Sequence, residues 1–229
     1  SFEIHDREGK PRLVRMLTWI EGRLWSQVKP HSPELLFALG AEAGALTRAL
    51  QSFDHDYAHR QFDWDIARLS WVEKHLELFD GENRIIIEAF LERFKAIAER
   101  YAGLPRSVVH NDVNDNNILV GGEARQPKVA AIIDYGDAIL TQTINDLAIT
   151  IAYAAMAKPD PLQAACNVVK GYATKYSPGE EEVEVLYTLV AARLIISVTK
   201  SALNRQQEPE NDYLLISEKP AWDLLKKWA

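Results

Sequence analysis

The sequence predicts an α+β fold: a mainly helical body with a small β-hairpin element in its middle and a second β-hairpin at its N-terminus. Three observations support this prediction. Apolar residues recur with helical spacing on both sides of residues 106–133, short β-branched runs lie within that stretch, and two extended segments flank the turn DREGKP near the start. The chain has 229 residues, of which 47% are apolar and 26% charged, as in ordinary globular proteins.

Local signals then place each element. Strands are predicted at about residues 2–5 and 12–19. Ser32 precedes a helix that begins at Pro33, because a serine side chain accepts a hydrogen bond from the first turn and proline fits the first helical position. The remaining elements are amphipathic helices over 63–79 and 81–103, strands at about 107–110, 117–120 and 129–133, and helices at about 145–157, 161–175, 180–204 and 211–228.

Composition narrows the class of protein. The net charge of −7 is spread without a long run of one sign, which argues against a nucleic-acid partner. The longest apolar run, residues 147–157, is too short to span a bilayer. The single cysteine, Cys166, excludes an intrachain disulfide and is expected to be a small buried helix residue. These features favour a cytoplasmic protein that does not bind membranes.

The segment HNDVNDNNILV, residues 110–120, crowds oxygen-bearing side chains beside an apolar strand. As a calcium loop it would place Asp112, Asn114 and Asn116 at the first three ligand positions and Glu123 at the twelfth. A helix–loop–helix calcium site needs a helix on each side of the loop. The flanking residues here favour strands, so a calcium site is the weaker alternative.

The same segment matches the kinase catalytic loop H-R-D-L-x-x-x-N, which is followed by D-F-G. His110, Asp112 and Asn117 occupy the corresponding positions, and Asp134 begins the later Asp-Tyr-Gly. Phosphoryl transfer needs a carboxylate beside the attacking hydroxyl and hard oxygen ligands for magnesium. Asp112 is therefore the predicted base, Asn117 and Asp134 are the predicted magnesium ligands, and His110 is expected to shape the loop. A hairpin that turns at Gly121-Gly122 would bring Asp134 beside Asn117.

These motifs resemble those of the aminoglycoside phosphotransferase and choline kinase family, whose members are small-molecule kinases with a protein-kinase-like fold. HNDVNDNNIL resembles the family's HGDLHPGNIL, IIDYGDA its metal-binding segment, and NDLA the segment whose aspartate, here Asp146, braces the catalytic loop. HNDVNDNNIL, IDYGD and NDLAITIAYA are most similar to the hydroxylysine-kinase-like branch. The resemblance implies ATP as phosphoryl donor and Mg²⁺ as cofactor. It also makes RMLTWIEG the segment between two lobes, with the backbone near Thr18 and Ile20 meeting the adenine.

The resemblance also divides the chain. Residues 1–22 correspond to the last hairpin of an N-terminal lobe and the inter-lobe hinge, and residues 23–229 to the C-terminal lobe. A Gly-rich phosphate loop and a strand lysine do not precede the hinge, and Lys10 lies in a turn. We therefore expect a chain that is incomplete for activity by itself.

The acceptor class stays open among an amino alcohol, a hydroxylysine-like amino acid and an aminoglycoside. Asp137 and Asp65 are candidate partners for an ammonium group, and Trp64 could offer a cation–π face, although core packing is the favoured role of that ring. The alternative function is a non-catalytic binding or regulatory lobe of a larger protein. A fused or associated enzyme domain, an aminotransferase in some bacterial members, is a further partner that the resemblance implies.

Overall fold

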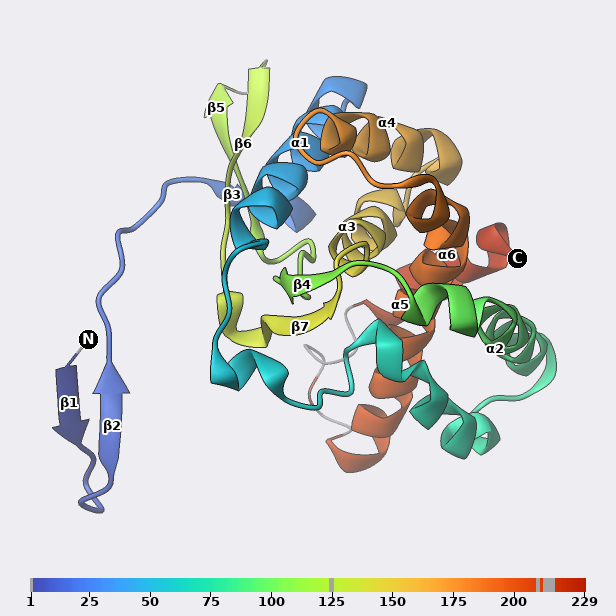
Figure 1. Ribbon diagram of the computed structural model, residues 1–229, viewed down its shortest axis with the longest axis horizontal. Coiled ribbons are helices and arrows are strands. Elements are labelled where there is room, and N and C mark those ends of the chain that lie inside the picture. Colours follow the sequence, from blue (N-terminus) through green and yellow to red (C-terminus); the bar gives the residue numbers. More distant parts are fainter. Residues whose placement is uncertain (1, 124–125, 209–210, 212–216) are drawn as a thin grey trace.

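Six α-helices form the body of the computed structural model, which describes residues 2–123, 126–208, 211 and 217–229 (Figure 1). They are α1 (Pro33–Leu50), α2 (Gly81–Ala102), α3 (Asn145–Ala155), α4 (Pro161–Ala173), α5 (Glu180–Gln207) and α6 (Glu218–Trp228). Ser32 caps α1 as expected, because its hydroxyl accepts from the Leu35 amide at 3.2 Å. The predicted start of the last helix at residue 211 is wrong, since α6 begins at Glu218, and residues 212–216 lie outside the described part.

The centre of the core is α3, in which every residue from Asn145 to Ala155 is buried. It packs against α4 on one side and α5 on another, while α2 and α6 pack against α5. A helix that is apolar nearly all round is stable only when other helices surround it, and the sequence NDLAITIAYAA meets that condition. Because the surrounding helices enclose α3, the residues at its N-terminal end are fixed in position.

Glycines on both helices allow α1 and α4 to cross at close range (Figure 1). A Cβ built on Gly40 would lie 1.9 Å from the Val168 carbonyl oxygen, and one on Gly171 would lie 1.9 Å from the Phe37 carbonyl oxygen. Both distances are far inside van der Waals contact. The contact between these helices therefore requires hydrogen at both positions.

Short strands lie beside the helical body. The pair β4 (Arg106–Val109) and β7 (Ile139–Gln142) is antiparallel, and β3 (Arg23–Leu24), β5 (Ile118–Glu123) and β6 (Gln126–Ile132) form a separate three-stranded sheet. The hairpin predicted around residue 120 is confirmed, but its turn is not at Gly121-Gly122. Both glycines belong to β5 and pair with Lys128 and Pro127. Strand β7 was not predicted from the sequence.

The N-terminal hairpin, β1 (Phe2–His5) and β2 (Pro11–Val14), stands apart from the helical body in Figure 1. Its second strand ends at Val14 and not at residue 19, so the predicted strand is too long. The segment from Arg15 to Gly22 has neither helix nor strand and is exposed throughout. None of the residues that the structure describes pairs with that segment to extend β2, which accounts for the early end.

Residues 63–79 do not form the α-helix that their apolar spacing predicts. After the cap residue Asp65 they form a 3₁₀ helix, η3 (Ile66–Leu78), with a kink at His75. The buried residues Ile66, Leu69 and Val72 are three apart, which matches the three residues per turn of a 3₁₀ helix. The remaining 3₁₀ segments are short: η1 (Trp25–Gln27), η2 (Asp56–His59) and η4 (Tyr135–Asp137).

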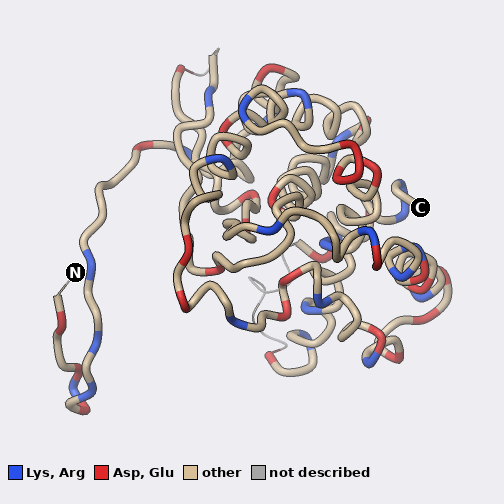
Figure 2. The backbone as a smooth tube through the Cα atoms, in the orientation of Figure 1, with Lys and Arg blue, Asp and Glu red and all other residues tan. Residues whose placement is uncertain are grey.

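Two surface features complete the fold. Figure 2 shows Lys and Arg interspersed with Asp and Glu along the chain, without a face of one sign in that view. Cys166 lies in a helix as expected, but its side chain on α4 is exposed and not buried. None of the helices in the described ranges is long and apolar enough to cross a membrane.

Replacing Gly171 by alanine tests the close crossing of α1 and α4. The added methyl group must push the two backbones apart, and we expect Gly171→Ala to lower the free energy of unfolding by about 3 kcal/mol. Chemical denaturation measures this change. Gly103→Ala is the matched control, because a Cβ there meets its nearest atom at 3.5 Å, and its effect should stay within about 0.5 kcal/mol. Equal effects of the two substitutions would contradict the close-crossing explanation.

Candidate functional site

The loop that joins β4 to β5, residues 110–117, is held by the core beneath it. His110 is fully buried, its Nδ1 accepts from the Asp112 amide at 3.2 Å and its Nε2 lies 3.0 Å from the Ile133 carbonyl oxygen. An imidazole that accepts at Nδ1 must carry its proton at Nε2 to donate to that carbonyl. His110 therefore links the start of the loop to the end of β6, which is the loop-shaping geometry expected of it.

Asp146, in the first turn of α3, holds the same end of the loop. Its two carboxylate oxygens accept from the backbone amides of His110 at 3.0 Å and Asn111 at 2.8 Å. Burial raises the pKa of Asp146, while the hydrogen bonds from the two amides favour the ionised carboxylate. Asn111 adopts a φ of 65°, a left-handed conformation that asparagine tolerates better than most residues. The bracing geometry expected of Asp146 is therefore present.

Three donors orient the carboxylate of Asp112. Its Oδ1 accepts from Arg193 Nη2 at 2.8 Å. Its Oδ2 accepts from the side-chain amides of Asn114 at 2.9 Å and Asn117 at 2.8 Å. With both oxygens engaged from different directions, the carboxylate cannot rotate without losing a hydrogen bond. It is also 21% exposed, so it remains open to a ligand.

Arg193 is the main site residue that the sequence did not reveal. It lies in α5 and is 1% exposed, and its guanidinium lies over the rings of Trp64 at 4.6 Å and Tyr153 at 5.5 Å. The cation–π face of Trp64 is therefore occupied by a side chain of the protein. Arginine is almost never fully buried unless it is paired, so its position within the apolar run of α5 was the available signal.

The β5–β6 hairpin brings the two predicted metal ligands to one end of the sheet. Ile118 pairs with Ile132, and the amide of Ile133 donates to the Asn117 carbonyl oxygen at 2.9 Å. Asp134 follows directly, in a left-handed conformation with a φ of 65°, and its Oδ1 accepts from the Gly136 amide at 3.2 Å. The hairpin therefore places Asn117 and Asp134 next to each other, as expected.

The side chains of this pair suit a hard cation. Asn117 donates through Nδ2 to Asp112, so its Oδ1 points away from the carboxylate and is left without a hydrogen bond from the described residues. Asp134 is exposed and has a second carboxylate oxygen. Magnesium prefers oxygen ligands and keeps several positions for phosphate and water. Two protein oxygens of this kind fit that requirement.

A cavity of about 210 Å³ opens beside Asp112. Besides Asp112, its polar and charged lining includes Asp115, Asp137, Arg193 and Lys200. Burial, followed by the charge of Asp112, raises the pKa of Asp137, and Arg60 lies 3.9 Å from its carboxylate. The site therefore presents side chains of both signs to a ligand beside Asp112.

Three of the predicted residues lie elsewhere. The prediction that Asp65 binds the ammonium group of a substrate is wrong. Its side chain does not line this cavity, because its buried carboxylate accepts from the Ala67 amide at 3.0 Å and the Thr141 hydroxyl at 2.8 Å. It caps η3 and does not face a substrate. Thr18 and Ile20 are exposed in the segment between β2 and β3 and do not line the cavity either.

The elements around the loop also decide against the calcium alternative. Strand β4 ends just before the loop and strand β5 begins just after it. A helix–loop–helix calcium site requires helices in both places to set the ligand cage. The geometry of the loop matches the kinase interpretation and not the calcium one.

The comparison with known sequences gives the family. Residues 3–186 match the model described as the phosphotransferase enzyme family, and the chain belongs to this family. It is 31% identical to the hydroxylysine kinase of Bos taurus over 233 residues, which cover 96% of this chain and 61% of that protein. It is 28% identical to the hydroxylysine kinase of Danio rerio, covering 90% of this chain and 60% of that protein. The chain thus spans about three fifths of the length of these curated relatives.

Solved structures with low sequence identity share the fold. The microcompartment-associated aminopropanol kinase superposes with a TM-score of 0.63 at 15% identity, covering 99% of this chain and 74% of that one. The GDP complex of an aminoglycoside 2'-phosphotransferase-IIIa mutant gives 0.61 at 15% identity, covering 99% and 72%. The amicoumacin kinase complex with AMP-PNP gives 0.58 at 15% identity, covering 90% and 62%. The predicted protein-kinase-like α+β fold is confirmed.

The pairing of Asp112 with Arg193 makes a prediction about stability. In Asp112→Asn the guanidinium stays buried without its anion, and either orientation of the new amide turns its NH₂ group toward a donor. We expect the free energy of unfolding of this chain to fall by about 2–4 kcal/mol, measured by chemical denaturation. The matched control is Asp134→Asn, an exposed position where asparagine keeps the left-handed backbone, with an effect within about 0.5 kcal/mol. An Asp112→Asn variant as stable as the control would show that the pair does not hold the loop.

Proposed function

We propose that this chain is the catalytic lobe of an ATP-dependent phosphotransferase that phosphorylates a hydroxyl group of a small molecule. The observation that carries the proposal is the carboxylate of Asp112, which Arg193, Asn114 and Asn117 orient beside an open cavity. The acceptor is an amino alcohol, a hydroxylysine-like amino acid or an aminoglycoside. The similarity of this chain to the hydroxylysine kinases and to the aminopropanol and aminoglycoside kinase structures supports this choice of acceptor.

In the proposed reaction Asp112 acts as the base. The acceptor hydroxyl donates a hydrogen bond to the carboxylate, which turns the hydroxyl oxygen toward the γ-phosphorus of ATP. The new oxygen–phosphorus bond forms as the bond between the γ-phosphorus and the β–γ bridging oxygen breaks. ADP leaves with that oxygen, and the hydroxyl proton passes to Asp112. Catalysis of this kind depends chiefly on position and charge, and the three donors around Asp112 supply position.

The proposed magnesium ligands are Asn117, through Oδ1, and Asp134. A Mg²⁺ ion held by these two residues would supply positive charge to balance the charge that develops on the phosphate groups. The hydrogen bond from Asn117 Nδ2 to Asp112 then connects the metal ligand to the base directly. In this proposal Asn117 therefore binds the metal ion through Oδ1 and orients the base Asp112 through Nδ2.

Residues 1–22 belong, in this proposal, to an N-terminal lobe and the hinge, with the backbone near Thr18 and Ile20 contacting the adenine. Apolar side chains in this stretch support the proposal, because Met16 is 93% exposed and Trp19 is 82% exposed. Large apolar groups exposed next to one another mark a surface that another part of a protein covers. In the same proposal residues 23–229 form the C-terminal lobe.

On the acceptor side, Asp137 is the proposed partner of an ammonium group. It lines the cavity beside Asp112, whereas Asp65 does not. Arg60 approaches its carboxylate only to 3.9 Å, so an oxygen remains free to accept from a substrate. Asp65 is therefore left out of the proposed acceptor site.

The test is ADP formation by the intact protein, including whatever precedes residue 1, with 5-hydroxylysine, an amino alcohol and an aminoglycoside as acceptors. We expect Asp112→Asn to reduce turnover by about 10²–10⁴-fold, the usual contribution of a positioned general base. The control is Asp54→Asn, an exposed carboxylate that pairs with His59 outside the cavity. Turnover by the control should match that of the unchanged protein.

Two results would contradict the proposal. Failure of the intact protein to form ADP with any of these acceptors would favour the alternative, a non-catalytic binding or regulatory lobe. Unchanged turnover in Asp112→Asn would remove Asp112 from the reaction. A circular-dichroism spectrum and a thermal melt of the variant distinguish loss of catalysis from loss of folding, which the Arg193 pair makes necessary.

A further inference from the structure

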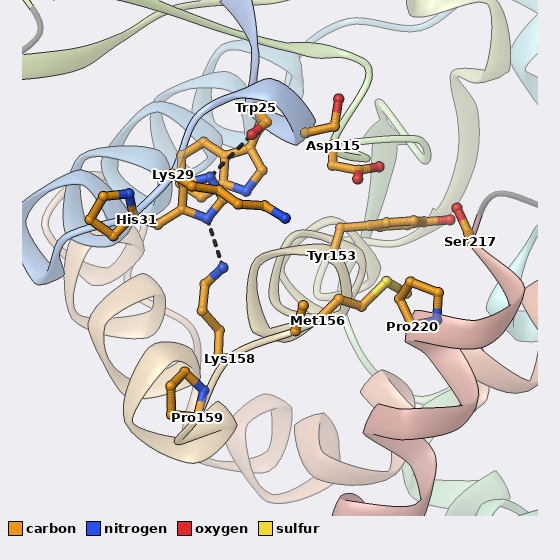
Figure 3. Close-up of a pocket in the computed structure, with 13 residues that line it drawn as sticks. Trp25, Lys29, His31, Asp115, Tyr153, Met156, Lys158, Pro159, Ser217 and Pro220 are labelled. Carbon is orange, nitrogen blue, oxygen red and sulfur yellow. Dashed lines mark hydrogen bonds between the residues drawn. The ribbon is translucent and has the colours of Figure 1, made fainter.

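A second, larger cavity adjoins the one beside Asp112 (Figure 3). Its volume is about 690 Å³, and it lies between the segment before α1, the residues that follow α3 and the start of α6. Asp115, Tyr153 and Ser217 line both cavities. A small molecule whose hydroxyl group lies at Asp112 can therefore extend into the larger cavity.

Cationic side chains occupy one wall of this cavity. Figure 3 shows Lys29, His31 and Lys158 together, with the Lys29 side chain reaching into the open space. The Lys158 ammonium lies 2.7 Å from His31 Nδ1. Neither lysine forms an ion pair with any residue in the described part of the chain. The wall thus carries two ammonium groups without a carboxylate in contact.

His31 holds Lys158 without neutralising it. Its Nε2 lies 3.1 Å from the Trp25 carbonyl oxygen, and its ring stacks on the Trp25 ring at 3.9 Å. An imidazole that donates at Nε2 and accepts an ammonium N–H at Nδ1 is the neutral form. Burial, and then the charge of Lys158, lower the pKa of His31 to about 4, in agreement with this geometry.

The charges of the cavity are not balanced internally. Burial, and then the charge of Lys29, lower the pKa of Lys158, so its ammonium is held in an unfavourable setting. The carboxylate in the lining is Asp115, which sits on the side shared with the smaller cavity and lies outside ion-pair distance of both lysines. An anionic group of a ligand would relieve the repulsion between the lysines.

We propose that Lys29 and Lys158 bind a carboxylate of the phosphate acceptor, which makes the acceptor a hydroxy amino acid and not a simple amino alcohol or an aminoglycoside. The proposal rests on the proposed function. Such an acceptor would place its hydroxyl at Asp112, its ammonium near Asp115 or Asp137, and its carboxylate between the lysines. A pair of charge-assisted hydrogen bonds to a carboxylate then provides the specificity.

The test is steady-state kinetics of the intact protein with a matched acceptor pair, 5-hydroxylysine and its α-carboxamide. We expect Lys158→Met and Lys29→Met each to lower kcat/KM for the acid by roughly 10- to 100-fold, the range for one hydrogen bond to a charged group. For the carboxamide, kcat/KM should fall clearly less than for the acid, since its oxygen can still accept a hydrogen bond from the ammonium but carries no negative charge. Lys74→Met, at an exposed lysine of η3 that lines neither cavity, is the control and should leave both values unchanged.

The outcomes separate this inference from the proposed function. Equal losses for the acid and the carboxamide, or a rise in KM for ATP alone, would overturn the carboxylate site while the phosphotransferase function stands. Unchanged protein that uses the amino alcohol as well as 5-hydroxylysine would do the same. Absence of turnover with every acceptor would overturn both proposals.

Discussion

The ion pair between Arg193 and Asp112 is the interaction on which the rest of the site depends. Arg193 is a buried cation in the longest helix of the core, and its guanidinium has little contact with water. A buried cation is tolerated only when an anion and hydrogen-bond acceptors surround it. Asp112 supplies the anion, and the Trp64 and Asn111 carbonyl oxygens lie 3.3 and 3.4 Å from Nη1. The core therefore needs Asp112 in place as much as the loop needs Arg193.

The loop is consequently held by two helices that are themselves packed together. Asp146 of α3 accepts hydrogen bonds from the amides of the first two loop residues. Arg193 of α5 donates to the carboxylate of Asp112, the residue that follows them. Because α3 and α5 are in direct contact, the two attachment points cannot move independently. The conformation at the loop is thus determined by packing of the core and not by the loop residues alone. The hairpin adds a third attachment through His110 and Ile133.

The sequence allowed prediction of the parts of this arrangement that depend on nearby residues. The loop spacing, the hairpin that returns Asp134 to Asn117, and the order of the helices all follow from local pattern, and the structure contains them. Arg193 could not be assigned to Asp112, because 81 positions separate them and only tertiary packing joins them. Asp65 was misplaced for a similar reason, since its partner Thr141 lies on the unpredicted strand β7.

In the proposed reaction the fixed conformation of the loop serves to orient the Asp112 carboxylate. During phosphoryl transfer the charge develops on the phosphate oxygens, so the acceptor hydroxyl needs chiefly to be oriented toward the γ-phosphorus. A carboxylate free to rotate would lose that freedom each time an acceptor binds, at a cost in free energy. Arg193 on Oδ1 and the two amides on Oδ2 have already restricted Asp112 during folding. The ordering of the base therefore belongs to the free energy of folding, and binding of the acceptor does not have to supply it.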